Sequence, residues 1–192
     1  MKRLFIDIET TGLSKDADIW QIAMIFDDGQ SATREYECFM RPKDDAVIED
    51  GARVSLATLQ ELPIRAAAFA EFKKFLDTCV DKFDKSDKMF LVGWNNYVFD
   101  NPRLRALWSE FNDQFFGSYF WPNAIDTMCL ASLALADKRD AMPNFRLGSV
   151  CEFLGIDIVP DKLHDAKYDV DLTMRVYFKS LSIIQSQTNY AE

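Results

Sequence analysis

Two carboxylates, Asp7 and Glu9, interrupt an otherwise apolar segment near the start of the chain. Residues two apart on a strand lie on the same face, so a strand over 3–9 would present both side chains together. Carboxylates on an apolar strand are costly unless a partner neutralises them, and Mg²⁺ and Mn²⁺ prefer oxygen ligands. The pair therefore predicts a metal site, with an edge strand whose face is solvated as the alternative.

The segment Thr10-Thr11-Gly12-Leu13 follows that strand directly. A glycine after a strand marks a sharp turn or a close approach of the backbone. Beside a metal, such a turn would let backbone amides and a threonine hydroxyl meet a substrate. An ordinary strand-ending turn explains the same residues equally well.

Asp100 follows the sequence WNNYVF, where a strand is expected to give way to a helix. Functional groups are common at that position in α/β folds. An aspartate there also serves as a helix N-cap, and for Asp100 taken alone the cap is the simpler interpretation.

His164 is the single histidine of the chain, and Asp169 lies five residues later. On a regular helix the two side chains would point about 140° apart. They can share one site only if His164 precedes the helix or sits on its first turn. Histidine is suited to proton transfer near neutral pH, whereas the alternative is a solvated histidine at a helix end.

The elements that must position these residues follow from the apolar patterns. Runs at 3–9, 19–26 and 33–40 predict three strands in a meander, and 89–94 predicts a further buried strand. Helical patterns cover 55–62, 64–83, 101–111, a segment starting at 126 or 127, 146–154 and 165–185. This order predicts an α/β domain around a mixed sheet. The aromatic residues at 115–121 are expected in the core rather than as a base-stacking surface.

Taken together, FIDIETTGL, GWNNYVFD and HDAKYD resemble, in order, the three motifs of the DEDDh (DnaQ-like) 3′–5′ exonuclease family. The second motif and the later PNFRLGSVCEFLGI are most similar to the nuclease domain of bacterial exonuclease I. The commoner family version has a histidine at the position of Trp94 and one residue fewer before the FD pair. This departure leaves the four carboxylates and the histidine in place.

The resemblance implies a ribonuclease H-like fold, a mixed five-stranded sheet flanked by helices. It further implies that two Mg²⁺ or Mn²⁺ ions are bound by a carboxylate set consisting of Asp7, Glu9, Asp100 and Asp169. His164 would be the general base in the release of nucleoside 5′-monophosphates from 3′ ends. The residues expected to contact substrate are Thr10, Thr11, Leu13, Asn96 and Phe99, and Asp126 is expected to have a supporting role.

Single-stranded DNA is the first substrate that the resemblance favours, and RNA ends or short oligonucleotides are the second. DNA repair and proofreading are the processes it suggests, and a polymerase, another protein partner or a homodimer stay open. Two alternatives remain: a non-catalytic interaction module with a nuclease fold, and a phosphodiesterase acting on small nucleotides.

Composition sets the remaining expectations. The 192 residues predict a single domain over 1–192. With 22 basic and 31 acidic residues the net charge is −9, which opposes binding to phosphate backbones and predicts an enzyme that acts on ends. Four separated cysteines predict free buried thiols. Because neither a signal-peptide pattern nor a membrane-spanning apolar run occurs, a cytoplasmic protein without a membrane partner is expected.

Overall fold

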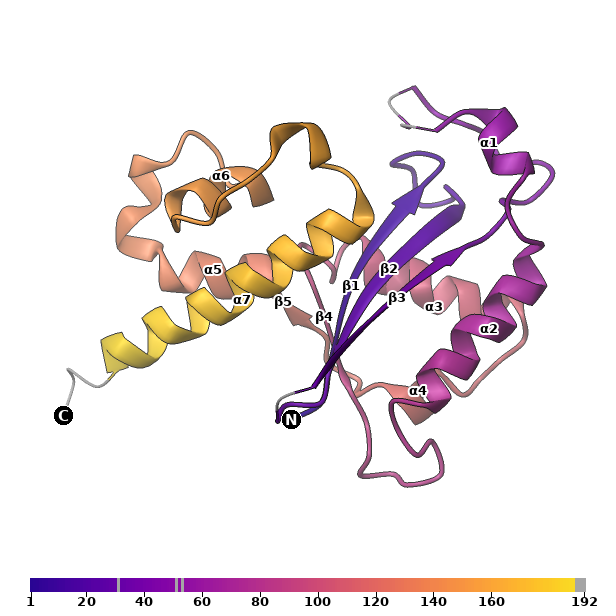
Figure 1. Ribbon diagram of the computed structural model, residues 1–192, viewed down its shortest axis with the longest axis horizontal. Helices are drawn as coiled ribbons and strands as arrows, with labels where there is room; N and C mark the ends of the chain where they lie inside the picture. Colours follow the sequence, from indigo (N-terminus) through magenta and orange to yellow (C-terminus); the bar gives the residue numbers. More distant parts are fainter. Residues whose placement is uncertain (31, 51, 53, 189–192) are drawn as a thin grey trace.

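A mixed sheet of five strands, in the order β3-β2-β1-β4-β5, organises the molecule. The computed structural model (Figure 1) describes residues 1–192 apart from 31, 51, 53 and 189–192. The antiparallel meander consists of β1 (Arg3–Thr10), β2 (Ile19–Asp27) and β3 (Thr33–Phe39). Parallel to β1 run β4 (Phe90–Gly93) and, beyond it, β5 (Ile125–Asp126). The predicted mixed sheet and its meander are confirmed.

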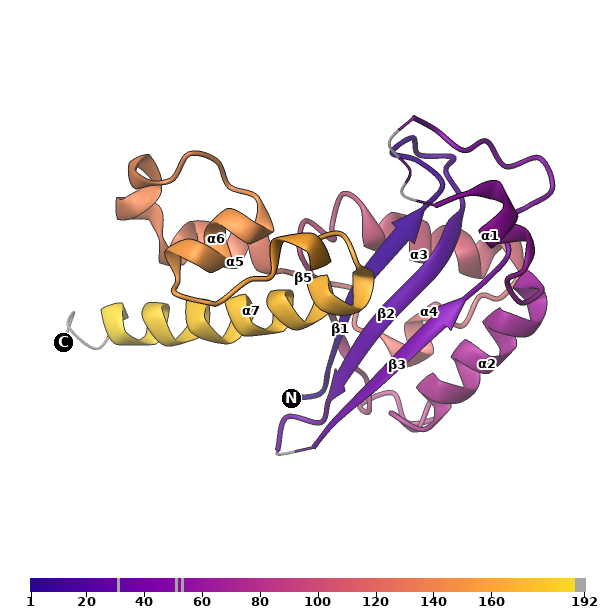
Figure 2. The same cartoon turned by 45° about the horizontal axis from the view of Figure 1, so that its top comes forward.

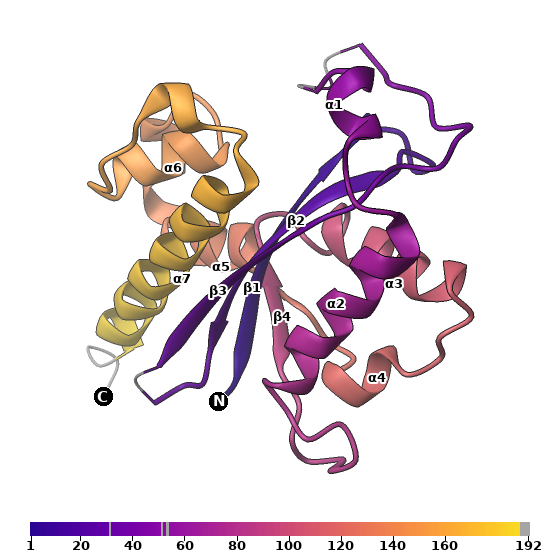
Figure 3. The same cartoon turned by 45° about the vertical axis from the view of Figure 1, so that its right-hand side comes forward.

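The helices lie on the two faces of this sheet. One face is covered by α2 (Arg65–Asp77), α3 (Asp100–Glu110) and α4 (Phe116–Tyr119), with the short α1 (Leu56–Gln60) preceding them. The other carries α5 (Thr127–Ala134), α6 (Leu147–Phe153) and α7 (Ala166–Thr188), with 3₁₀ turns at Ala136–Ala141 and Pro160–Lys162. Figures 2 and 3 both place the sheet between α7 and the α2–α3 pair.

The alternation along β1 divides its side chains between these two layers. Leu4, Ile6 and Ile8 are buried in the core beneath α2 and α3. Phe5 is buried on the opposite face, in a cluster with Tyr177 of α7. Since successive residues alternate, Asp7 and Glu9 belong to the face that α7 covers.

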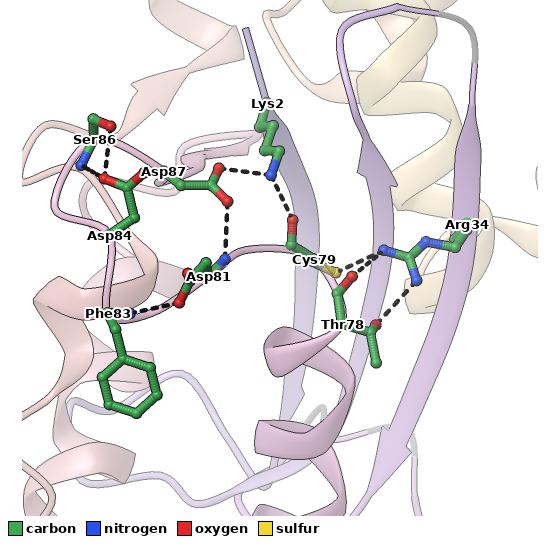
Figure 4. A network of polar contacts seen from close by, with 9 residues as sticks. All are labelled: Lys2, Arg34, Thr78, Cys79, Asp81, Phe83, Asp84, Ser86 and Asp87. Atoms are coloured by element: carbon green, nitrogen blue, oxygen red, sulfur yellow. Dashed lines mark hydrogen bonds and ion pairs between the residues drawn. The ribbon is translucent and has the colours of Figure 1, made fainter.

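The helix predicted at 64–83 ends earlier, at Asp77, and the residues after it form a loop that Lys2, just before β1, holds in place. Lys2 Nζ donates to the Cys79 carbonyl oxygen (3.0 Å) and forms an ion pair with Asp87 (2.6 Å). Asp87 also accepts the backbone N–H of Asp81 (2.9 Å), as Figure 4 shows. The carboxylates of this loop therefore hold its turns, because Asp81, Asp84 and Asp87 each accept a backbone N–H.

Two further expectations concern apolar residues. Phe116, Tyr119 and Phe120 are buried around Trp108, so the aromatic segment 115–121 is mainly core, whereas Phe115 is exposed. All four cysteines are free thiols, but the expectation that they are all buried is wrong for Cys129, which lies on the exposed side of α5. Over the described residues, no helix has the length and apolar character needed to cross a membrane.

Candidate active site

The site begins at the carboxyl end of β1. Asp7 lies opposite Ala23 of β2, and Glu9 lies opposite Gln21. The pairing shifts between Glu9 and Thr10, where the strand turns into the loop that follows. The two carboxylates thus stand near the end of a central strand, on the same face, and the shared face is what their spacing predicted.

Asp100 reaches this strand from the start of α3. The parallel pairing of β1 with β4 ends at Phe5, and further along β1 the Ile8 N–H donates to Asp100 Oδ1 instead (3.1 Å). Gly93 lets the end of β4 lie close to β1, since a Cβ there would lie 2.9 Å from the Ile6 carbonyl oxygen. Asp100 is only 3% exposed, and its carboxylate is held against β1 from the side of α3.

His164 and Asp169 meet in the way that a shared site requires. His164 has a φ of 71°, in the left-handed region, and lies before α7, which begins at Ala166. Its backbone N–H donates to Asp169 Oδ2 (3.0 Å), while its imidazole lies on the exposed surface. Because His164 has a left-handed backbone conformation, it lies outside the helix. The separation of about 140° that a regular helix would place between the side chains of His164 and Asp169 therefore does not apply.

The carboxylates form one electrostatic cluster. Burial raises the pKa of Asp7 well above its usual range, and the neighbouring carboxylates raise it further, in the order Asp100, Asp169, Glu9 and Asp165. Burial also raises the pKa of Asp100 to about 7, although the hydrogen bond from Ile8 and the charge of Arg103 oppose this shift. Strand β1 and the starts of α3 and α7 therefore bring the four motif carboxylates close enough for Asp7 to interact electrostatically with the other three.

The fit to a metal rests on this donor set. Among the described residues, no three His, Cys, Asp or Glu side chains are already arranged to hold a metal ion. The cluster is nevertheless made of carboxylate oxygens, the ligands that hard divalent cations prefer. A cation would also offset the repulsion that raises the pKa of Asp7. The residues fit such an ion in type and position without forming a closed coordination shell.

Three of the predicted substrate residues have side chains turned into the protein. Thr10 Oγ1 donates to the Gly12 carbonyl oxygen (2.5 Å), and Thr11 Oγ1 accepts the Asp18 N–H (3.1 Å). Asn96 Nδ2 donates to a carbonyl oxygen of β5 (3.3 Å). Thr11 and Asn96 are both 0% exposed. Their side chains hold the loops in place, and the contact of these residues with a substrate stays a prediction.

The other two predicted residues are accessible. Leu13 is 83% exposed at the tip of the loop after β1, and Phe99 is half-buried just before α3. Arg103 contacts both: it donates to the Leu13 carbonyl oxygen (3.0 Å), and its guanidinium lies 3.7 Å from the centre of the Phe99 ring. Leu13 and Phe99 therefore stand near one another, beside the carboxylate cluster.

Sequence reasoning missed Glu49 and Arg103. Glu49 accepts the backbone N–H of Leu13 (2.7 Å), and Arg103 donates to the carbonyl oxygens of Leu13, Ser14 (2.7 Å) and Phe99 (3.0 Å). Glu49 lies in a polar connection that carries no motif. The one signal for Arg103 is its place one helical turn after Asp100. Asp126 has the expected supporting role, because it caps α5 and accepts the Asn95 N–H (3.1 Å).

A hollow of about 740 Å³ lies next to the site, between β2, β3 and the start of α7. Ala23, which lies opposite Asp7 on β2, is one of the residues that line the hollow. None of the five motif residues lines it. The acidic residues along it outnumber the lysines, being Glu35, Glu37, Asp161, Asp165 and Asp171 against Lys162 and Lys167. Such a lining is poorly suited to a nucleic-acid backbone.

Several solved structures of exonuclease I have a similar fold. An Escherichia coli exonuclease I structure in complex with a dT13 oligonucleotide is 20% identical, with a TM-score of 0.74, and the match covers 99% of this chain and 42% of that one. A product-bound exonuclease I structure is 21% identical, with a TM-score of 0.72 and coverages of 98% and 45%. The zinc-bound form of an E. coli exonuclease I complex with single-stranded DNA is 21% identical, with a TM-score of 0.73 and coverages of 96% and 40%.

The present chain thus spans less than half the length of these solved chains. The matches confirm the ribonuclease H-like fold, a mixed sheet flanked by helices. No curated protein is matched by sequence. The family model RNase T, described as an exonuclease, matches residues 4–177, which include all three motifs. The chain therefore belongs to the RNase T family of exonucleases, the DnaQ-like 3′–5′ exonucleases that its motifs predicted.

Proposed function

We propose that this exonuclease releases nucleoside 5′-monophosphates from the 3′ ends of single-stranded DNA, with RNA ends as its second substrate. The observation that carries the proposal is the cluster at the end of β1, where Asp7 interacts with Asp100 and Asp169 and where Asp169 fixes His164. The exonuclease I structures bound to an oligonucleotide and to single-stranded DNA support the choice of substrate.

Asp7, Glu9, Asp100 and Asp169 are the residues proposed to hold two Mg²⁺ or Mn²⁺ ions. Bound divalent cations supply Lewis-acid stabilisation of phosphate charge and lower the pKa of water. The zinc-bound exonuclease I complex supports a divalent-cation site in this fold. Asp100 and Asp169 each also accept a backbone N–H, from Ile8 and His164, which fixes one oxygen of each carboxylate.

His164 is proposed to accept the proton of the attacking water at an imidazole nitrogen. Its exposed side chain lies outside the helix, and its backbone is tied to Asp169. An imidazole titrates near neutral pH, so it can take up a proton and then give it back to solvent. No covalent intermediate is needed, and three of the four thiols are buried.

The 3′ nucleotide is proposed to lie between Leu13 and Phe99, which are accessible apolar residues near the carboxylates. Thr10, Thr11 and Asn96 then contribute through the backbone that they hold, rather than through their side chains. The acidic hollow along β3 opposes passage of the strand on that side. All three motifs lie on one sheet and its flanking helices, which supports a single exonuclease domain over 1–192.

Matched strands of single-stranded DNA, duplex DNA and RNA, each labelled at the 5′ end, test this function. With Mg²⁺ or Mn²⁺ we expect a ladder that shortens one nucleotide at a time, fastest on single-stranded DNA, and we expect no products in EDTA. Faster digestion of RNA would favour the second substrate. Internal cuts, or activity unaffected by EDTA, would contradict the proposal.

A further inference from the structure

Two residues outside the three motifs, Glu49 and Arg103, form hydrogen bonds with the loop after β1 from opposite sides. On one side the carboxylate of Glu49 accepts the backbone N–H groups of Leu13 (2.7 Å) and Ser14 (3.3 Å). The backbone adds a further tie, since the Glu49 N–H donates to the Thr11 carbonyl oxygen (2.8 Å). The connection between β3 and α1 is thereby fastened to the loop at three donors.

On the other side the buried guanidinium of Arg103 donates to the carbonyl oxygens of Leu13 (3.0 Å) and Ser14 (2.7 Å). The same two residues therefore have their N–H groups bound by a carboxylate and their carbonyl groups bound by a guanidinium. The peptide unit that joins Leu13 to Ser14 is therefore restrained at both its carbonyl oxygen and its N–H, and each of the two neighbouring units is held at one group.

Arg103 also joins the loop to the second motif. Its guanidinium stacks on the Phe99 ring at 3.7 Å and donates to the Phe99 carbonyl oxygen (3.0 Å). Burial lowers the pKa of Arg103, and the charges of Asp100 and Glu49 oppose that shift. Burying the charge of Arg103 costs desolvation energy, and its hydrogen bonds go to carbonyl oxygens. An apolar residue at this position would pack without that cost. The placement of Arg103 ties Leu13, Phe99 and the helix of Asp100 into one unit.

Gly12 makes room for the carboxylate. A Cβ at this position would overlap the side chain of Glu49. The hydrogen bonds from Ser14 and Leu13 also lower the pKa of Glu49, so the carboxylate stays charged in this place at neutral pH. Gly12 is thus required by the contact with Glu49 and not only by the turn.

We propose that Glu49 and Arg103 are positioning residues that clamp the Thr10–Ser14 loop for the 3′-terminal nucleotide. The inference rests on the proposed function, since it assigns the loop to the 3′ end. Neither residue is expected to touch the reacting phosphate. Their effect is to hold Leu13 and Phe99 at a fixed separation beside the carboxylates, and a displacement of about 1 Å in such a site costs about 100-fold in rate.

The test combines amide hydrogen exchange with steady-state digestion of single-stranded DNA, using Glu49→Gln, Glu49→Ala and Arg103→Lys. Two matched controls are Glu61→Ala, an exposed carboxylate beyond α1, and Arg105→Lys. Arg105, like Arg103, lies on α3, stacks on an aromatic ring (4.2 Å) and donates to a backbone carbonyl, but it does not contact the loop.

For Glu49→Ala we expect the amides of Leu13 and Ser14 to exchange about tenfold faster or more, with the core amides unchanged. We expect kcat/KM to fall about 100-fold, with the melting temperature and the Mn²⁺ affinity close to those of the wild type. Glu49→Gln keeps an acceptor oxygen and should recover most of the activity. Arg103→Lys should lose activity through the lost stacking and bridging, whereas both controls should digest DNA normally.

Unchanged exchange and unchanged kinetics in Glu49→Ala would overturn the clamp. A rise in activity would also overturn it, since Glu49 would then obstruct the loop rather than position it. A wild-type protein that releases no mononucleotides would refute the proposed function. The exchange measurement would still decide whether Glu49 and Arg103 hold the loop.

Discussion

Asp7 is the motif carboxylate whose charged form is most destabilised by its surroundings. Its pKa is raised by burial and by four neighbouring carboxylates. Replacing Asp7 with asparagine removes one charge from this cluster. In EDTA we therefore expect Asp7→Asn to raise the free energy of unfolding by about 1 kcal/mol, a common trade between activity and stability. Denaturant unfolding of both proteins in EDTA measures the difference.

The same substitution should abolish the additional stability that Mn²⁺ gives to the wild type, because a proposed ligand is lost. Asp16→Asn, which alters an exposed carboxylate in the loop after β1, serves as the control and should change neither quantity. A variant Asp7→Asn that is less stable than the wild type in EDTA would show that the carboxylates do not repel one another.

Single residues could be predicted from the sequence where their type is unexpected at that position. Residues that act through ordinary hydrogen bonds to the backbone could not be predicted. A carboxylate pair on an apolar strand and a lone histidine are visible in the sequence. Glu49 acts through the N–H groups of Leu13 and Ser14, and that contact depends on a connection folding back over 35 residues or more. Thr11 and Asn96 were assigned to substrate by position, but their burial became visible only in the fold.

Among the elements, the start of α5 is tied to the turn that leads into α3. Asp126 Oδ1 accepts the Met128 N–H (2.9 Å) as an N-cap and also the Asn95 N–H (3.1 Å). Asn95 has a φ of 55°, so the turn is held in a left-handed conformation. We expect Asp126→Ala to lower the free energy of unfolding by about 2 kcal/mol. Digestion by the folded variant should also slow, and an effect on neither quantity would contradict this role.

The end of α2 gives a pH-dependent contribution to stability. Asp77 accepts the Tyr119 hydroxyl (2.8 Å) and the Lys82 ammonium (2.9 Å), and these bonds lower its pKa although burial opposes them. A lowered folded-state pKa stabilises the protein above the unfolded value of about 3.9, and this contribution is lost as the pH falls through the folded-state value. Asp77→Asn should therefore be less stable at pH 7 and approach the wild type below about pH 4, as measured by urea unfolding.

The long elements could be predicted because their apolar periodicity extends over many residues. The meander, α3 and α7 begin and end close to the expected positions. The two-residue β5 and the four-residue α4 carry too few residues for a period, so tertiary packing determines them. The overlong prediction for α2 followed apolar residues that belong to a loop held by Lys2.

At the scale of the whole molecule, a net charge of −9 must be reconciled with a polyanionic substrate. The acidic hollow along β3 adds to the repulsion, whereas the metal ions proposed at the site would reduce it locally. We expect few phosphate contacts, and so a slope of log K against log salt concentration between about −1 and −2 for single-stranded DNA. Fluorescence anisotropy with a catalytically inactive variant measures this slope, and a slope steeper than about −5 would reveal an extended basic interface.

The motif residues are proposed to remove nucleotides from 3′ ends, with His164 as the base. The deciding experiment identifies the product that the wild type and His164→Ala release from single-stranded DNA labelled either at the 3′ or at the 5′ end. We expect the wild type to release the 3′ label first, as a nucleoside 5′-monophosphate, and His164→Ala to do so at least about 100-fold more slowly. Release of the 5′ label first, or unchanged activity in His164→Ala, would contradict this proposal.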